Sequence, residues 1–237
     1  RPPPDIWNQL SYEKQKSIMP AWKFDMFYRG RFTRPIGLVY DCFSEAQDVV
    51  PRFEIPKTWL IHVGHDFGQA NPAAMFYAES PGTGQLFAFR EYMPGPGRSP
   101  YDHIQAWKEI TAGYNVVTRM GGNWTSEEET RAAYTQQGWP ILKPAWKSVH
   151  EQVSKVYAMN KLHRVKVFSD LEHYIDQKTS FSFKLDGKHQ PTDDYDNEAD
   201  MHLLAAERYI LSSFPAETLL NKRKTSRVQD FSNWKPQ

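Results

Sequence analysis

The feature that most constrains the fold is a series of three short apolar segments between residues 59 and 92. Segments 59–64, 73–78 and 85–92 are rich in β-branched, aromatic or small apolar residues, and they follow one another at hairpin distances. Turn-forming residues at 80–84 separate the second segment from the third. Three consecutive antiparallel strands are therefore expected.

Alternating helices and strands are predicted for residues 101–213. Apolar residues recur at helical spacing over 101–112, 126–137, 148–162, 169–177 and 198–213, and short apolar runs at 115–120, 140–142 and 165–168 are typical of strands. Segment 178–196 is polar and rich in turn-forming residues. This order predicts an α/β mixed sheet with helices on both faces, which is the element order of the ribonuclease H-like fold.

Residues 58–214 carry this regular pattern and are expected to form one domain. Residues 1–57 are rich in proline and show no sustained period, which predicts a linker or appendage with a short hairpin near 29–40. Residues 215–237 include a basic run and predict a flexible tail. Because the sequence opens without Met, it reads as a piece of a longer protein.

The composition excludes several protein classes. No segment approaches the roughly 20 consecutive apolar residues of a membrane span. The single cysteine, Cys42, rules out a disulfide within the chain and favours a reducing, cytoplasmic setting. The 29 Lys and Arg against 28 Asp and Glu give a net charge of +1, which neither requires nor excludes a nucleic-acid partner. No Walker A string occurs, so ATP hydrolysis by that route is not expected.

Asp66 is the most informative polar residue, because it follows the first predicted strand and precedes Phe67-Gly68. An ionised carboxylate at the centre of a sheet costs several kcal/mol unless a cation or hydrogen-bond donors compensate it. Asp66 is therefore either a metal ligand or the acceptor of an Asx turn onto Gly68. His65 and His202 are expected to be structural or to support such a ligand, and His65 could orient Asp66 or touch a phosphate.

Two further acidic groups are predicted to reach the same edge of the sheet. Glu127, Glu128 and Glu129 follow the fourth strand, and Glu129 also fits a capping box with Ser126 at the helix start. We assign Glu129 to capping and Glu127 to chemistry. Asp200 lies three or four residues before the apolar residues of the last predicted helix, although acids in a first turn are also ordinary partners of the helix dipole.

Three carboxylates around one crevice would repel one another unless divalent cations neutralised them. Oxygen ligands favour Mg²⁺ or Mn²⁺ over Zn²⁺, and two such ions could activate a water and stabilise the leaving oxygen of a phosphodiester. A DNA substrate also requires positive charge beside the crevice. The candidates are Arg98, Arg119, Arg131, Lys143 and Lys147.

Several motifs follow one another along the chain: Asp66-Phe67-Gly68 with Asn71-Pro72, Gly121-Gly122 with Ser126-Glu127, Gly138-Trp139-Pro140, Val153 with Val156-Tyr157, and His202 with Ala206-Glu207-Arg208-Tyr209-Ile210. In this order and spacing, the chain resembles the C-terminal nuclease domain of the large terminase subunit of tailed bacteriophages. The resemblance covers about residues 36–213 and depends on the combination, since no single motif is specific.

The resemblance implies a ribonuclease H-like, metal-dependent endonuclease with Mg²⁺ or Mn²⁺ as cofactor. Such an enzyme cuts concatemeric double-stranded viral DNA during genome packaging in the host cytoplasm. The resemblance assigns the catalytic acids to Asp66, Asp200 and, in the middle, Glu127. It also implies a motor ATPase domain N-terminal to this fragment, with the portal protein and the small terminase subunit as partners.

Two departures from the family pattern leave the metal ligands open. Many relatives carry an Asp at the end of the fourth strand, where this chain has Met120-Gly121-Gly122, so the middle ligand is either Glu127 or Glu128. Many also carry a second Asp one turn into the last helix, where this chain has Ala205. The alternatives to Asp200 are therefore Asp196 and Glu198.

Two other functions fit parts of the pattern. Actin-like phosphotransferases also place D-x-G after their first strand, but they need a second phosphate-binding turn that this sequence does not show. A non-catalytic interaction module of a nucleoprotein assembly would use the aromatic N-terminal region and the basic tail. The substitution Asp66→Asn separates these functions, because a binding module would tolerate it and a metal site would not.

Overall fold

A computed structural model describes residues 37–68, 72–122 and 127–216. The chain divides into two compact units. In the described part, the larger unit comprises residues 40–68, 72–122, 127–179 and 197–216, and the smaller comprises residues 37–39 and 180–196.

The larger unit is built on a mixed sheet of six strands within the described residues, in the order β1-β6-β4-β3-β2-β5. The strands are β1 (Val49–Val50), β2 (Leu60–Asp66), β3 (Ala73–Glu79), β4 (Leu86–Tyr92), β5 (Asn115–Gly121) and β6 (Val165–Phe168). Only β3 runs opposite to the other strands, because it pairs antiparallel with β2 and β4 while the remaining pairs are parallel. The carboxyl ends of β2, β4 and β5 therefore meet at one edge of the sheet, where α/β proteins place their sites.

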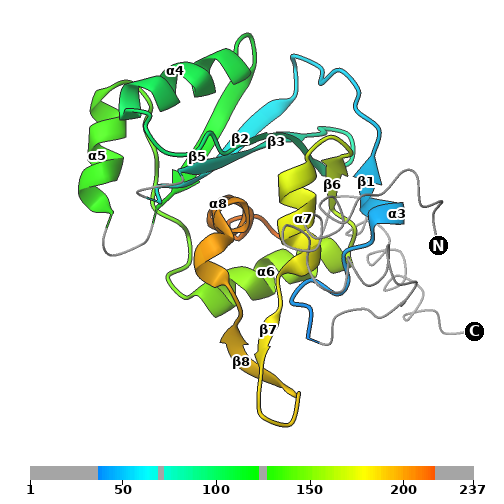
Figure 1. The fold of residues 1–237 in the computed structure, drawn as a ribbon. Coiled ribbons are helices and arrows are strands. Elements are labelled where there is room, and N and C mark those ends of the chain that lie inside the picture. Colours follow the sequence, from blue (N-terminus) through cyan, green and yellow to red (C-terminus); the bar gives the residue numbers. More distant parts are fainter. Residues whose placement is uncertain (1–36, 69–71, 123–126, 217–237) are drawn as a thin grey trace, which may run out of the picture. The chain divides into compact units, whose positions relative to one another are not determined.

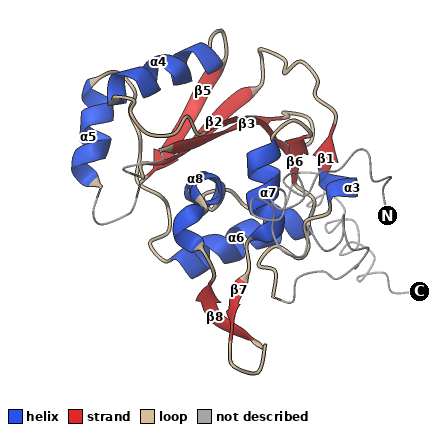
Figure 2. Ribbon diagram, in the orientation of Figure 1, coloured by secondary structure: helices blue, strands red, loops and turns tan. Residues whose placement is uncertain are grey.

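Helices cover both faces of this sheet (Figures 1 and 2). Helices α4 (Pro100–Ile110) and α5 (Glu128–Gln136) lie on one face, and α6 (Val149–Lys161), α7 (Glu172–Ser180) and α8 (His202–Leu211) lie on the other. A short helix, α3 (Glu45–Asp48), precedes β1, and a 3₁₀ turn, η1 (Glu198–Asp200), precedes α8. In the smaller unit, β7 (Phe183–Leu185) and β8 (Pro191–Tyr195) form an antiparallel hairpin.

The core explains why β2 and β3 read as continuous apolar runs. Almost every residue of both strands is buried, as expected for central strands covered on two faces. Along β2 the side chains alternate between the faces. Gly64 meets α8, whereas the neighbouring His65 packs on Trp107 of α4 at a ring distance of 4.3 Å.

The structure confirms the α/β mixed sheet, its three leading antiparallel strands and the ribonuclease H-like arrangement. The strand expected at 140–142 is reduced to a single parallel bridge between Met120 and Leu142. Pro140 and Pro144 flank this bridge and cannot donate backbone hydrogen bonds, which limits its extension.

Segment 178–196 contains the hairpin β7–β8, whereas the sequence pattern predicts irregular structure there. The strands escape the pattern because they are short and polar. Two local features specify the hairpin. The Asp186 side chain accepts hydrogen bonds from the backbone amides of Lys188 and Gln190 in the turn, and Tyr195 stacks on Phe183.

The part of the chain before β2 also differs from the prediction. Residues 49–50 form the edge strand β1, so this part of the expected appendage belongs to the larger unit. The first half of the hairpin expected near 29–40 lies outside the described residues, and Leu38 makes only a bridge to Ser182. Among the described residues, no helix combines the length and apolar character needed to cross a membrane.

Candidate functional site

Asp66 ends β2 at the carboxyl edge of the sheet, and its side chain is 13% exposed. Its carboxylate does not pair with a neighbouring turn in the described residues. Instead, Nδ1 of His202, the first residue of α8, donates a hydrogen bond to Asp66 Oδ2 over 2.8 Å. A contact between residues so distant in sequence indicates a built site rather than a local Asx turn.

Gly64 explains how α8 reaches Asp66. A Cβ atom on Gly64 would lie 2.0 Å from the backbone carbonyl oxygen of Ala206, so α8 crosses β2 in direct backbone contact. His202 lies one helical turn before Ala206, and Asp66 lies two residues after Gly64 on the same face of the strand. The close crossing therefore places the start of α8 over the end of β2.

The contact gives the site a positive charge beside the carboxylate. The hydrogen bond to Asp66 raises the pKa of His202, burial works against the rise, and the charges of Asp66 and Asp200 add to it. The imidazolium form of His202 is therefore stabilised beside Asp66. It supplies at this carboxylate the kind of charge that a bound cation would supply.

Glu127 and Glu198 also contribute to the electrostatic field at this edge. Burial raises the pKa of Tyr209, which lies two turns into α8, and Asp66 contributes the next largest effect. Arg208 opposes the rise, while Glu127 and Glu198 add to it. The field of three carboxylates thus reaches one tyrosine, a residue of the last motif of the sequence that had no predicted role.

Gly121 gives a physical reason for the missing acid at the end of the fourth strand. A Cβ atom there would lie 2.2 Å from the backbone carbonyl oxygen of His65. Gly122 donates its backbone N–H to the same oxygen over 3.0 Å and adopts a φ of 74°. The ends of β5 and β2 are therefore too close for an aspartate at position 121.

The two candidates for the middle acid, Glu127 and Glu128, have different surroundings. Helix α5 begins at Glu128, and Glu127 is its half-buried N-cap residue. The exposed Glu128 side chain forms ion pairs with Lys143 and with Arg131, and these partners lower its pKa. Ser126, the expected N-cap, lies outside the described residues, and Glu129 occupies the first turn of α5.

The acids before α8 lie on different elements from those expected. Residues 198–200 form η1 and the α-helix begins only at His202, because Met201 between them has a non-helical backbone with φ of −92° and ψ of 53°. The exposed Asp200 therefore does not share the helical face assigned to it. Glu198 pairs with the buried Arg208 over 3.0 Å. Asp196 belongs to the smaller unit.

Carboxylate groups are the available metal donors around Asp66. Asp66, Glu127 and Asp200 offer carboxylate oxygens, which suit Mg²⁺ or Mn²⁺. Across the described ranges, no three acids, histidines or cysteines are gathered closely enough to hold an ion together. The donor chemistry fits such an ion around Asp66, whereas the arrangement is not that of a formed three-ligand cage.

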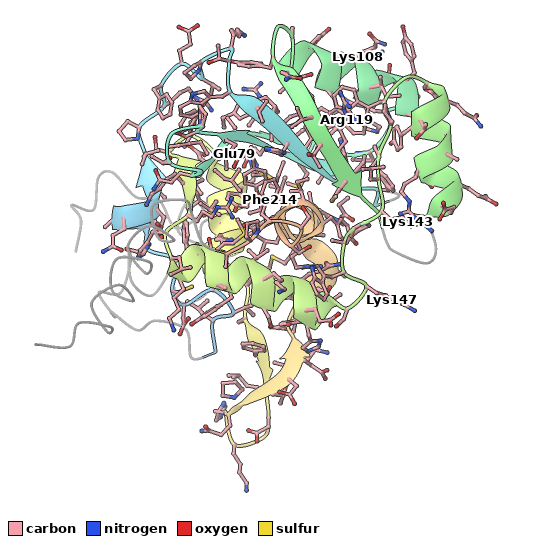
Figure 3. All side chains as sticks on the ribbon, turned by 180° about the vertical axis from the view of Figure 1, so that it is seen from behind. Glu79, Lys108, Arg119, Lys143, Lys147 and Phe214 are labelled. Atoms are coloured by element: carbon pink, nitrogen blue, oxygen red, sulfur yellow. The ribbon has the colours of Figure 1, made fainter. Side chains whose placement is uncertain are left out.

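Basic side chains line the β5 edge of the sheet. Figure 3 shows Lys108 of α4, Arg119 of β5, and Lys143 and Lys147 of the segment after α5 along this side. Arg119 is half-buried, with its guanidinium 4.3 Å from the centre of the Trp139 ring. Lys147 is exposed, and Lys143 pairs with Glu128.

The remaining basic candidates and His65 differ in their access to solvent. Arg98 is exposed in the loop before α4. Arg131 is 4% exposed and donates to the Gly121 carbonyl over 3.2 Å, so we remove it from the expected DNA contacts. His65 is fully buried and accepts a hydrogen bond from Trp139 Nε1 over 3.1 Å. It supports the fold under Asp66 and cannot touch a phosphate.

The fold is that of the nuclease domain of phage large terminases. The large terminase of a thermophilic bacteriophage matches with a TM-score of 0.64 and 14% identity over 88% of this chain and 53% of that protein. The P22 large terminase nuclease domain matches with a TM-score of 0.54 and 16% identity over 76% of this chain and 97% of that domain.

A third match is the large terminase nuclease of thermophilic phage G20c, solved with bound magnesium. It has a TM-score of 0.57 and 14% identity over 75% of this chain and 97% of that nuclease. This chain therefore spans about half of the first of these terminases and matches nearly all of the two isolated nuclease domains. No protein-family model and no curated protein sequence matches it.

Proposed function

We propose that this chain is a divalent-metal-dependent endonuclease that hydrolyses phosphodiester bonds of double-stranded DNA. The observation that carries the proposal is the bond between Asp66 and His202 at the carboxyl edge of a terminase-nuclease fold. At this edge a carboxylate on the buried strand β2 meets the first residue of a helix from the far end of the sequence. The carboxylates at Glu127 and Glu198 add negative charge beside it.

Asp66 is the proposed central ligand, because it ends β2, a strand that is buried from Ile61 to His65. Glu127 and Asp200 are proposed as the further ligands, with Glu198 and Glu128 as alternatives. When bound, Mg²⁺ or Mn²⁺ would activate a water and stabilise the leaving oxygen of the cleaved bond. His202 holds the Asp66 carboxylate in orientation through its Nδ1–H group.

We further propose that DNA approaches along the β5 edge. Lys147 and Arg119 would contact backbone phosphates there. Lys143 would leave its ion pair with Glu128 to contact a phosphate, and Arg98 would border the DNA-binding groove. These residues read charge and not base identity, so cleavage is expected to show little sequence preference. In a packaging motor, the partners would be an ATPase domain, a portal protein and a small terminase subunit, acting in the host cytoplasm.

Supercoiled plasmid incubated with the purified chain and Mg²⁺, Mn²⁺ or EDTA tests the proposal. We expect nicking and linearisation that require the metal and disappear in Asp66→Asn. The exposed Glu109→Gln on α4 is a control for the change of charge, and its cleavage should equal that of the wild type. Equal cleavage by Asp66→Asn and the wild type would refute the mechanism.

A matched series of glutamate variants identifies the middle ligand. Glu127→Gln, Glu128→Gln and Glu129→Gln make the same change at three adjacent positions at the start of α5. We expect only Glu127→Gln to reduce metal-dependent cleavage strongly, because the charge of Glu127 acts on Tyr209 together with that of Asp66, whereas Glu128 pairs with Lys143 and Arg131. A loss confined to Glu128→Gln would transfer the role to Glu128.

A further inference from the structure

A pocket of about 250 Å³ opens beside the end of β2, on the face of the sheet that carries α5. Phe67 and Gly68, which directly follow Asp66, form one wall. The loop before α4 and the residues Thr130 and Tyr134 of α5 form the others. The pocket is therefore adjacent in the chain to the proposed catalytic carboxylate, although the mechanism above does not use it.

The walls of the pocket include flat apolar faces. Phe67 stacks on Tyr134 with a centroid distance of 5.2 Å and an interplanar angle of 30°. Pro72, Pro96 and Pro100 also line the pocket. Surfaces of this kind favour a planar ring over a hydrated ion.

Polar groups line the same space. Tyr134 is 4% exposed, and its hydroxyl has no hydrogen-bond partner in the described part of the chain. Burial raises the pKa of Tyr134 to about 12, so the hydroxyl keeps its proton and can donate. The hydroxyl is therefore available to a ligand that supplies an acceptor.

His103 and Arg98 add further hydrogen-bond capacity. His103 is 3% exposed, and its Nδ1 shares a hydrogen bond of 2.8 Å with the Tyr92 hydroxyl. Its Nε2 atom has no protein partner within the described ranges. Burial lowers the pKa of His103, and the charge of Arg98 lowers it further. A neutral imidazole and a guanidinium can therefore both donate to a ligand with acceptor atoms on its edge.

We propose that this pocket binds one unstacked nucleobase of the DNA strand whose phosphate lies at Asp66. The proposal rests on the proposed nuclease function and names a part of its substrate. Proteins that take up an extruded base hold it by stacking against aromatic or apolar side chains and by hydrogen bonds to its edge, and this pocket offers both. Because Phe67 directly follows Asp66, the base belongs to a nucleotide beside the bound phosphate.

The test measures DNA binding by Asp66→Asn, which keeps the DNA intact. Three duplexes of otherwise identical sequence are compared: one fully matched, one with a central mismatch and one with a single abasic site. The mismatched base is the cheapest to unstack, and the abasic site has no base to insert. We expect the mismatched duplex to bind about 5- to 150-fold more tightly than the abasic duplex, the range for one stacked base.

Two substitutions in the same background assign the preference to the pocket. Tyr134→Phe removes only the unpartnered hydroxyl and should reduce the preference about 2- to 12-fold, the value of one hydrogen bond. Thr130→Trp fills the pocket from a half-buried position and should abolish the preference. Tyr101→Phe on α4, where the side chain is 61% exposed, is the matched control and should change nothing.

The outcomes separate this proposal from the nuclease function. Equal affinity for the three duplexes, or no binding to any of them, overturns the pocket proposal, even if the wild type cuts plasmid. A preference for the mismatch that both pocket variants leave unchanged overturns it too. A preference that Tyr134→Phe weakens supports the pocket, and the absence of plasmid cleavage by the wild type would then count only against the nuclease.

Discussion

A buried ion pair fastens α8, the helix that carries His202, to α7. The side chains of Lys178 and Glu207 are both 0% exposed and form an ion pair. The Tyr174 hydroxyl donates to the same Glu207 oxygen over 2.6 Å, and Lys178 Nζ lies 4.1 Å from the centre of the Tyr40 ring. Burial lowers the pKa of Lys178, while the charge and hydrogen bond of Glu207 oppose this change.

The substitution Glu207→Gln removes one charge of this pair and leaves Lys178 as an uncompensated buried cation. We expect the free energy of unfolding to fall by about 3–5 kcal/mol, the usual cost of breaking a buried pair. In a domain of this size, 1 kcal/mol corresponds to roughly 2–4 °C, so Tm should fall by about 6–20 °C. The exposed pair Arg52–Asp170 has side chains that are 41% and 52% exposed, and Asp170→Asn should cost less than about 1 kcal/mol.

Urea and thermal denaturation at pH 7 measure both effects. The double variant Lys178→Met/Glu207→Leu should regain most of the lost stability, because apolar side chains of similar volume replace a desolvated pair at little cost. A loss in Glu207→Gln no larger than that in Asp170→Asn would refute the reasoning. It would mean that Lys178 gives up its proton, or gains water, at negligible cost.

Three other perturbations test the packing, the titration and the charged edge. Gly64→Ala should destabilise the fold by at least about 3 kcal/mol in urea denaturation, because its Cβ would meet a backbone carbonyl of α8, whereas Gly82→Ala has open space and should be neutral. Burial lowers the pKa of His62 against the pull of Glu79, so its unfolded form binds a proton first as the pH falls below about 6.5, and stability is lost there. Between pH 7 and pH 5, His62→Gln should therefore lose about 1–2 kcal/mol less stability than the wild type. Denaturation curves at the two pH values measure this, and an equal loss of stability in variant and wild type would contradict it. Lys147→Gln should reduce the slope of log affinity for duplex DNA against log salt by about 0.9, and an unchanged slope in a salt titration would place Lys147 outside the interface.

The sequence pattern predicts the elements of the sheet because their signals are local. Apolar runs bounded by turn residues identify β2, β3 and β4, and helical spacing identifies α4 and α6 within a few residues of their bounds. The pattern fails where an element is short and polar, as in β7 and β8, or depends on a distant partner, as in β1. The predicted start of α8 is also wrong, because the non-helical backbone of Met201 separates η1 from α8 and the α-helix begins only at His202.

The candidate site likewise has features that follow from the local sequence and features that depend on distant packing. The position of Asp66 after a buried strand is a local property, and the resemblance to a family motif strengthens its assignment. The burial of Arg131 and His65 is not local, because it depends on how α5 and Trp139 pack over the ends of β2 and β5. A charged residue on a predicted helix is read as exposed unless the packing partner is known.

By itself, the sequence determined most of the segments that form strands and helices, that they assemble into a mixed α/β sheet, and that a carboxylate ends one of its buried strands. Only the tertiary structure decided that His202, and not a helical Asp200, meets that carboxylate, and that Gly121 leaves no room for a second acid. The physical reason is the distance along the sequence over which each interaction acts. Periodicity and turn chemistry act over a few residues, whereas the contact of His202 with Asp66 joins residues 136 positions apart through the close crossing of α8 over Gly64.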